Sequence, residues 1–306
     1  MALRPEPAST MRVLIAGASG LIGTPLVARL RSRGHEVHTL VRRAPKDASE
    51  HQWDPASRQI DQGIVDHVDA VINLSGASIS RIPWTTAWKE AILTSRVDAT
   101  TTIVSAISSS PTPPQHLIQA SGVSIYGEGG TGDLNEDSDL GEGFLADVAR
   151  AWEGATVALE HSSTRVVMAR TGLVIARGGA MAPLRLVTLL GVGGPIGRGN
   201  QWWPWISLDD EVDALVFLLE HQTLTGPVNL VGPTPATAND VTRGLARLLK
   251  RPHWLGLPEF AVKIVLGQAG RELLLASQKV VPSRLQDAGF EFSDQTITEA
   301  LDSLAD

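Results

Sequence analysis

Short apolar runs alternate with amphipathic segments through most of the chain. Runs rich in Val, Ile and Leu are typical of strands buried on both faces of a sheet. The longer segments between them repeat their apolar residues every three or four positions, as helices do. This alternation predicts an α/β fold, a Rossmann-type doubly wound parallel sheet covered by helices on both faces. The predicted strands are 11–16, 36–41, 69–74, 116–120 and 165–170, and the predicted helices are 24–33, 86–108 and 144–161.

The pattern changes after Val174. Residues 176–205 are rich in Gly and Pro, and a helix is expected from about Ser207, whose side chain can cap it, to Glu220. From Pro233 onward, helical segments are broken by prolines. We therefore expect a smaller, mainly helical C-terminal lobe beside the sheet. The expected divisions are a disordered tail at 1–10, a Rossmann domain of 11–175 and 206–232, and a second lobe of 176–205 and 233–306.

Composition narrows the class of protein. The 306 residues include no cysteine, which excludes disulfides, thiolate metal sites and thiol nucleophiles. The net charge of −7 argues against a nucleic-acid-binding surface. No apolar run reaches the ~18 residues of a membrane-spanning helix, and the N-terminal residues lack the apolar core of a signal peptide. The eight histidines show no metal-ligand spacing. We expect a cytoplasmic protein without a metal, a nucleic-acid partner or a membrane anchor.

A glycine-rich sequence, GASGLIG, lies between the first predicted strand and the first predicted helix. Glycines at this spacing permit a tight turn and let the backbone approach a diphosphate closely, while the helix N-terminus adds free N–H groups and a positive dipole end. The alternative is a purely structural turn, but the position in the first βαβ unit favours a dinucleotide site. The expected contacts are Gly17, Ser19, Gly20, Leu21, Ile22 and Gly23.

The end of the second predicted strand indicates which dinucleotide binds. NAD sites usually place an Asp or Glu there, which accepts a hydrogen bond from the ribose 2′-hydroxyl. This chain has Arg42 and Arg43 instead, and no carboxylate before Asp47. Two guanidinium groups suit a 2′-phosphate, so we expect NADP(H) rather than NAD. The alternative is a solvated basic pair that follows a strand.

The single tyrosine, Tyr126, follows the strand predicted at 116–120 and lies near Ser121 and Ser124. These three residues are the catalytic candidates, because ligands bind at the carboxyl edge of such sheets. Short-chain dehydrogenases use a Tyr with a Lys four residues later, which lowers the pKa of the phenol. Gly130 stands at that position here, so the usual Tyr/Lys pair is absent. Lys89 could replace the lysine from another helix, although a solvated lysine and a packed tyrosine are the alternatives.

Several motifs occur in a fixed order along the chain. They are GASGLIG, NLSG at 73–76, the segment with Trp84, Trp88, Lys89, Glu90, Ser95 and Arg96, SIYG, Trp152-Glu153, RTG at 170–172, GGPIGRG at 193–199 and WPWISLDD at 203–210. With these motifs the chain resembles the epimerase family of atypical short-chain dehydrogenase/reductases. Members are grouped with NAD-dependent or nucleoside-diphosphate-sugar epimerases, and some are labelled cell-division-inhibitor-like.

The resemblance implies an extended Rossmann fold, NADP(H) binding and further cofactor contacts. The matching positions are Leu74, Ser75, Glu90, Arg96 and Val174. It favours an oxidoreductase or sugar-epimerase-like enzyme that transfers a hydride to or from a small molecule, such as a carbonyl compound or a nucleotide-sugar, and it suggests a homodimer. The rival hypothesis is an NADP(H)-sensing protein without turnover. The missing Tyr/Lys pair favours the sensor, and the Trp-rich second lobe favours the enzyme.

Overall fold

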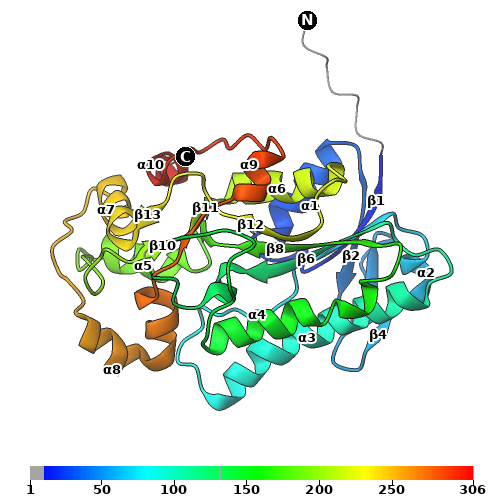
Figure 1. Cartoon of the computed structure of the whole chain (residues 1–306), viewed down its shortest axis with the longest axis horizontal. Coiled ribbons are helices and arrows are strands. Elements are labelled where there is room, and N and C mark those ends of the chain that lie inside the picture. Colours follow the sequence, from blue (N-terminus) through cyan, green and yellow to red (C-terminus); the bar gives the residue numbers. More distant parts are fainter. Residues whose placement is uncertain (1–9, 131, 306) are drawn as a thin grey trace, which may run out of the picture.

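A computed structural model describes residues 10–130 and 132–305, so the expected tail lies outside the described residues apart from Thr10. An eight-stranded sheet forms its centre (Figure 1). The strands are β1 (Arg12–Ala16), β2 (Glu36–Val41), β3 (Glu50–Asp54), β4 (Gln59–Ile60), β5 (Ala70–Asn73), β6 (His116–Gly122), β8 (Arg165–Thr171) and β12 (Gly226–Leu230). Their order is β12-β8-β6-β5-β1-β2-β3-β4, and every pair is parallel except β3 with β4. The predicted Rossmann-type sheet is confirmed.

Helices cover both faces of this sheet (Figure 1). On one face lie α1 (Gly23–Ser32) and α6 (Leu208–Glu220), and on the other lie α3 (Thr86–Ser109) and α4 (Phe144–Gly154), with the short α2 (Gln62–Val65) near the β4 edge. Successive residues of β1 point to opposite faces, as the pleat requires. Ile15 packs in the core with α1 and α6, whereas Leu14 packs in the core with α3.

A smaller, mainly helical region follows the sheet and confirms the expected second lobe in outline. Its own core contains Trp203, Trp205, Leu245 and Leu301. The helices are α5 (Met181–Leu189), α7 (Ala238–Leu248), α8 (Glu259–Gly270), α9 (Ser283–Asp287) and α10 (Ile297–Asp302). The short strands are β7 (Asp133–Leu134), β9 (Leu173–Ile175), β10 (Trp202–Trp203), β11 (Trp205–Ser207), β13 (Ala236–Thr237) and β14 (Lys279–Val280).

Three local expectations have clear outcomes. The Ser207 hydroxyl accepts a hydrogen bond from the Asp210 N–H at 3.2 Å, so the predicted cap of α6 is confirmed. The helix expected over 144–161 is shorter than predicted, because α4 ends at Gly154 and a 3₁₀ turn follows at Val157–Leu159. The Gly/Pro-rich stretch 176–205 contains α5, whose Pro183 lies in the first turn, where a missing N–H costs nothing. Within the described residues, no helix combines the length and apolar character needed to cross a bilayer.

Candidate functional site

Gly17 directly follows β1 and turns the chain toward α1. Its φ is +83°, in the left-handed region that glycine tolerates. A Cβ atom there would lie 2.8 Å from the carbonyl carbon of Leu74 and 3.1 Å from the Ser75 nitrogen. Only a glycine therefore lets the loop after β1 touch the loop after β5. The structure thus brings together three of the residues that the sequence assigned to the cofactor.

The other two glycines of the loop differ in what surrounds them. A Cβ at Gly23 would lie 2.3 Å from the Gly17 carbonyl oxygen, so this glycine is needed for the shape of the loop. A Cβ at Gly20 would meet only that same oxygen, at 3.2 Å, and Gly20 is exposed. Among the described residues, the backbone N–H groups of Ser19, Leu21 and Ile22 have no protein acceptor. These donors surround the start of α1, an arrangement that suits a bound anion.

The two arginines after β2 have different surroundings. Arg43 forms a two-point ion pair with Glu50 of β3, with N–O distances of 2.6 and 2.5 Å. These hydrogen bonds, together with the one from the Lys46 N–H, lower the pKa of Glu50 to about 2. Arg42 is exposed, and its guanidinium has no hydrogen bond or ion pair to any residue that the structure describes. Arg42 is therefore the arginine that remains available for a phosphate.

Arg96 lies against the loop that follows Ser75. Its Nη1 donates to the carbonyl oxygens of Ala77 and Ile92, both at 3.0 Å, and its guanidinium carbon lies 4.8 Å from the centre of the Trp152 ring. Burial lowers the pKa of Arg96 to about 10, and no carboxylate pairs with it among the described residues. The structure therefore places a partly buried positive charge beside Ser75.

The two remaining residues that the sequence predicts to contact the cofactor, Val174 and Glu90, have different surroundings. Val174 of β9 pairs with Ile206 of β11 and packs against the same large core cluster as Ile22 and Leu74. Glu90 is exposed on α3, and its carboxylate makes no hydrogen bond or ion pair with another of the predicted cofactor residues that the structure describes. The glycine loop, the arginine pair and the Leu74–Ser75 segment follow the neighbouring parallel strands β1, β2 and β5, so they lie at the same carboxyl edge of the sheet, whereas Glu90 lies apart from them on α3.

Tyr126 occupies the centre of a buried polar network. It lies in the 3₁₀ turn Val123–Tyr126 after β6 and is only 2% exposed. Its hydroxyl donates to Asn229 Oδ1 at 2.8 Å and accepts from Arg170 Nη1 at 2.9 Å. Burial raises the pKa of Tyr126, although the positive charge of Arg170 opposes the shift. This geometry favours the packed-tyrosine alternative, because the hydroxyl both donates and accepts within the protein.

Arg170 and Glu153 hold this network together. The guanidinium contacts both carboxylate oxygens of Glu153, at 2.8 and 2.9 Å, and the Ser121 hydroxyl donates to Glu153 at 2.7 Å. Ser121 is 5% exposed. Ser124 makes only a long contact, 3.5 Å, with the Leu145 carbonyl oxygen. Two of the motifs noted in the sequence, Trp152-Glu153 and RTG, therefore have a structural role in orienting the turn after β6.

Lys89 does not supply the missing lysine in this arrangement. Its Nζ donates to Gln268 Oε1 at 2.8 Å and lies 4.7 Å from the centre of the Phe144 ring. Among the described residues, no hydrogen bond joins Lys89 to Tyr126. Gln268 in turn donates to Glu272, whose carboxylate accepts from the N–H groups of the first residues of α4. Lys89 thus helps to join the helical lobe to the Rossmann part of the molecule.

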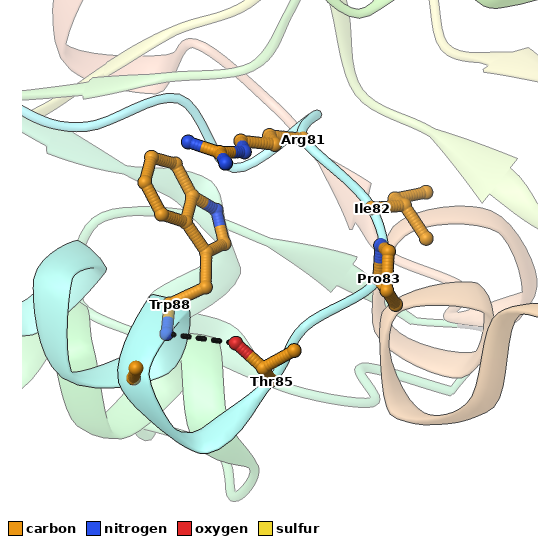
Figure 2. Close-up of a pocket in the computed structure, with 6 residues that line it drawn as sticks. Arg81, Ile82, Pro83, Thr85 and Trp88 are labelled. Carbon is orange, nitrogen blue, oxygen red and sulfur yellow. Dashed lines mark hydrogen bonds between the residues drawn. The ribbon is translucent and has the colours of Figure 1, made fainter.

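An open hollow of about 360 Å³ is lined by the loop between Ser75 and α3 and by the first turn of α3. Figure 2 shows Arg81 lying over the Trp88 ring, with its guanidinium carbon 4.2 Å from the ring centre. The Thr85 hydroxyl accepts from the Trp88 N–H at 3.1 Å and so caps α3. The lining residues are Arg81, Ile82, Pro83, Thr85, Ala87 and Trp88. The hollow is wide and exposed, and it borders the loop that continues from the cofactor residues.

The sequence did not lead us to predict one buried acid, Glu211, as a residue of interest. Glu211, in the first turn of α6, is 0% exposed and accepts from the Thr171 hydroxyl at 2.8 Å. Its second oxygen has no partner among the described residues, and burial raises its pKa to about 8. Its spacing in the sequence could have predicted this burial, because Glu211 lies on the same helical stripe of α6 as Leu215 and Leu218. No group of His, Asp and Glu side chains suited to a metal occurs within 10–130 and 132–305.

Comparison with known proteins gives a consistent assignment. The model of the NAD dependent epimerase/dehydratase family matches residues 13–232, and a domain of unknown function, DUF1731, matches residues 257–304. An epimerase family protein of Mycobacterium leprae, ML0860, is 41% identical over 290 residues, which cover 94% of each chain. The crystal structure of human epimerase family protein SDR39U1 with NADPH is 35% identical, with a TM-score of 0.87, and the match covers 96% of this chain and 99% of that one.

A more distant solved structure shares the fold alone. The UDP-glucuronic acid 4-epimerase of Bacillus cereus, in complex with UDP-glucuronic acid and NAD, is 17% identical with a TM-score of 0.75 and matches 95% of this chain and 96% of that one. The resemblance noted in the sequence is confirmed by the family model and by the relatives above 30% identity. The chain belongs to the NAD dependent epimerase/dehydratase family, in its branch of epimerase family proteins.

Proposed function

We propose that the protein binds NADP(H), with the diphosphate at the start of α1 and the adenosine 2′-phosphate at Arg42. The free N–H groups of Ser19, Leu21 and Ile22 support the first contact, because a helix N-terminus with unpaired donors attracts an anion. The observation that carries the proposal is the unpaired guanidinium of Arg42 directly after β2, where an NAD site would have a carboxylate. The human relative was solved with NADPH.

The other predicted contacts are consistent with this placement. Leu74 and Ser75 touch Gly17, and Val174 packs on the same core as Ile22, so these residues can line the cofactor beyond its diphosphate. Arg96 adds positive charge beside Ser75. Glu90 is the weakest of the proposed contacts, because its carboxylate is exposed and separate from the rest.

We further propose that the protein is an oxidoreductase or epimerase-like enzyme that acts on a small molecule. NADPH, when bound, supplies a hydride to a carbonyl carbon. A proton must then reach the carbonyl oxygen, and the buried, doubly hydrogen-bonded hydroxyl of Tyr126 is poorly suited to give it. Ser124 lies at the same strand end with only a long 3.5 Å contact, so its hydroxyl can position the substrate while a water molecule supplies the proton to the carbonyl oxygen. Ser121, which is 5% exposed and donates to Glu153, can act only by holding this turn in place. Substrate classes consistent with the family are carbonyl compounds and nucleotide-sugars.

The experiment is a screen of NADPH oxidation against panels of carbonyl compounds and nucleotide-sugars. The expected result is turnover with at least one class, which falls sharply in the Arg42→Ala variant at low NADPH and recovers as NADPH is raised. Such recovery separates weakened cofactor binding from lost chemistry. Turnover that is equally fast with NADH would contradict the assigned role of Arg42.

A second candidate is an NADP(H)-binding protein without turnover. Short-chain dehydrogenases use a tyrosine and a lysine together. Here the Tyr126 hydroxyl is hydrogen-bonded to Arg170 and Asn229, whereas the Lys89 ammonium is hydrogen-bonded to Gln268, and this separation favours a protein without turnover. Under this alternative, NADPH binds tightly but the whole substrate panel leaves it unoxidised. The same screen therefore separates the two functions.

A further inference from the structure

The loop after Ser75 and the first turns of α3 carry more positive than negative charge. The charged side chains of residues 77–96 are Arg81, Lys89, Glu90 and Arg96. Within the described part of the chain, none of the three bases pairs with a carboxylate. Lys89 bonds to an amide oxygen, Arg96 bonds to two backbone carbonyl oxygens, and the Arg81 guanidinium has no hydrogen bond. The segment therefore presents positive charge that no described acid neutralises by direct contact.

Arg81 lies exposed at the hollow of about 360 Å³, where its guanidinium stacks on the Trp88 ring. The ring supports the cation from one side, and the guanidinium N–H groups stay free to donate. Figure 2 shows the Trp88 indole nitrogen on the side of the ring that is turned toward Ile82 and Pro83, which also line the hollow. This indole N–H is buried and has no acceptor among the described residues. A buried donor without a partner costs free energy, so an acceptor that entered the hollow would gain from both groups.

A second stack of the same kind lies on the other side of this loop. The Arg96 guanidinium lies over the Trp152 ring, and the Trp152 indole N–H likewise has no acceptor within 10–130 and 132–305. Gly76 permits this packing, because a Cβ there would lie 2.9 Å from the guanidinium carbon. Donors thus exceed acceptors on both sides of the loop, a distribution that suits an anion.

Two acids on the elements packed beside these stacks are engaged elsewhere. Glu272 accepts from the N–H groups of Phe144 and Leu145, and Glu153 pairs with Arg170. Their carboxylates therefore satisfy other donors and leave the charge of Arg81 uncompensated.

The hollow also borders the strand end that holds Ser124. Trp84, which lies between two of the lining residues, packs edge-on against Phe144 with the ring centres 5.4 Å apart. The next residue, Leu145, has its carbonyl oxygen 3.5 Å from the Ser124 hydroxyl. The segments that follow β5 and β6 therefore meet at the hollow, and ligands of doubly wound sheets bind at this carboxyl edge.

The size and lining of the hollow indicate what can bind there. Its volume is at the lower end of the range of about 300–1,000 Å³ that is usual for ligand sites. Apart from Arg81, Thr85 and the Trp88 indole, the lining is apolar and consists of Ile82, Pro83 and Ala87. These properties suit a small molecule with an apolar part and one negatively charged group. A nucleotide-sugar, with its base, sugars and diphosphate, needs more room.

We propose that the hollow binds an anionic group of the substrate, and that the substrate is therefore a small carbonyl compound with a carboxylate or a phosphate. Arg81 donates to the oxygens of this group, in the manner of guanidinium groups that bind carboxylates and phosphates. The group is bound and does not react. The role of the carbonyl rests on the proposed function, whereas the binding of the anion requires no turnover.

Calorimetric titration with 4-formylbenzoate and with its methyl ester tests the proposal, because the two share a ring and an aldehyde and differ in charge. The protein is saturated with NADP⁺, which cannot give a hydride, and the titration is repeated without the dinucleotide. We expect the acid to bind at least ~10-fold more tightly than the ester in both cases, since charge-assisted hydrogen bonds form only with the acid. Glyceraldehyde 3-phosphate and glyceraldehyde form a second pair, and the pair with the larger ratio identifies the anion.

Arg81→Gln should remove most of this preference and leave the affinity for the methyl ester unchanged. Arg81 is exposed, so the variant should fold normally, which a thermal melt checks. Arg243→Gln is the matched control, because Arg243 is an exposed arginine of α7 that does not line the hollow. It removes the same charge from the molecule and should leave the preference intact.

Four results would overturn the proposal. They are equal affinity within both pairs, no binding of either charged compound, a preference that survives Arg81→Gln, and a preference that Arg243→Gln removes equally. Failure of the proposed function gives a different result. An Arg81-dependent preference, together with no NADPH oxidation by any compound, would support the anion site and contradict the proposed turnover. NADPH oxidation by uncharged compounds alone would support the turnover and contradict the anion site.

Discussion

Arg43 and Glu50 form a two-point ion pair, with the guanidinium nitrogens 2.6 and 2.5 Å from the two carboxylate oxygens. The pair joins the end of β2 to the start of β3. It fixes the direction of the chain at the point where the adenosine end of a dinucleotide would lie. It also distinguishes the two adjacent arginines, because Arg43 is committed to Glu50 while Arg42 remains unpaired among the described residues.

Arg42→Ala should therefore weaken NADPH binding more than Arg43→Ala does. Loss of charge-assisted hydrogen bonds to a phosphate costs about 1.5–3 kcal/mol, which corresponds to a more than tenfold change in affinity. NADH affinity should hardly change, since NADH lacks the 2′-phosphate. Calorimetric titration measures both, with Arg247→Ala, an exposed arginine of α7, as the control. A larger loss from Arg43→Ala would mean that the Glu50 pair opens when the cofactor binds.

Gly20→Val should abolish NADPH binding and leave the fold intact. The added side chain meets only the Gly17 carbonyl oxygen at 3.2 Å within the protein, but it occupies the space that a diphosphate needs. Gly23→Ala should instead lower the melting temperature, because its Cβ would lie 2.3 Å from that oxygen. Gly154→Ala serves as the control, since nothing lies within 4 Å of its added Cβ. Normal NADPH affinity of the Gly20→Val variant would mean that the loop is only a structural turn and does not bind the diphosphate.

Tyr126→Phe should act on stability rather than on catalysis. The variant leaves Asn229 Oδ1 and one Arg170 nitrogen without their partner, at a cost of about 1–3 kcal/mol in the free energy of unfolding. NADPH affinity and any turnover found in the screen should stay within a few-fold. Because burial raises the pKa of the phenol, no alkaline rise in rate from a phenolate is expected. A fall in turnover of ~10²–10⁴ with normal NADPH affinity would restore Tyr126 as the proton donor.

Glu211 should make the protein less stable as the pH rises. Its pKa is about 8 in the folded state against a usual value of 4.5, so the folded state binds the extra proton between these values. The free energy of unfolding should therefore fall between about pH 4.5 and 8 and level off above, by on the order of 5 kcal/mol in all. Urea unfolding at several pH values measures this slope.

Glu211→Gln should flatten that slope, because the amide oxygen can still accept from Thr171 and nothing titrates. Asp209→Asn, in the same helical turn but with a 70% exposed side chain, should leave the slope unchanged. A slope that persists in Glu211→Gln would show that another group carries the pH dependence.

Much of the Rossmann part of the fold could be predicted because each of its elements carries a local signal. The strand over 36–41 has the predicted bounds, and the long helix expected at 86–108 ends one residue later, at Ser109. β3 was missed because its residues, Glu50 to Asp54, are mostly polar, and the strand forms by pairing with β2 on one side and β4 on the other. α5 was missed because the surrounding Gly and Pro residues hide its short amphipathic pattern. Such elements form through tertiary contacts that a single sequence does not reveal.

The candidate site also has one part that could be predicted from the sequence and one part that could not. The glycine loop is encoded locally, since strand, turn and helix are consecutive. The contacts of Tyr126 are not, because Asn229 and Arg170 lie 103 and 44 residues away in sequence and meet it only when β6, β8 and β12 are assembled. The pairing of Arg43 with Glu50 likewise depends on how β3 sits beside β2. Residue type alone could therefore not separate the free arginine from the paired one.

Calorimetric titration of the unmodified protein with NADPH and with NADH, side by side at one ionic strength, measures whether the protein selects the dinucleotide with a 2′-phosphate. We expect NADPH to bind more than ~10-fold tighter than NADH, because only NADPH carries the phosphate that Arg42 can bind. Equal affinity for the two dinucleotides, or binding of neither, would contradict it.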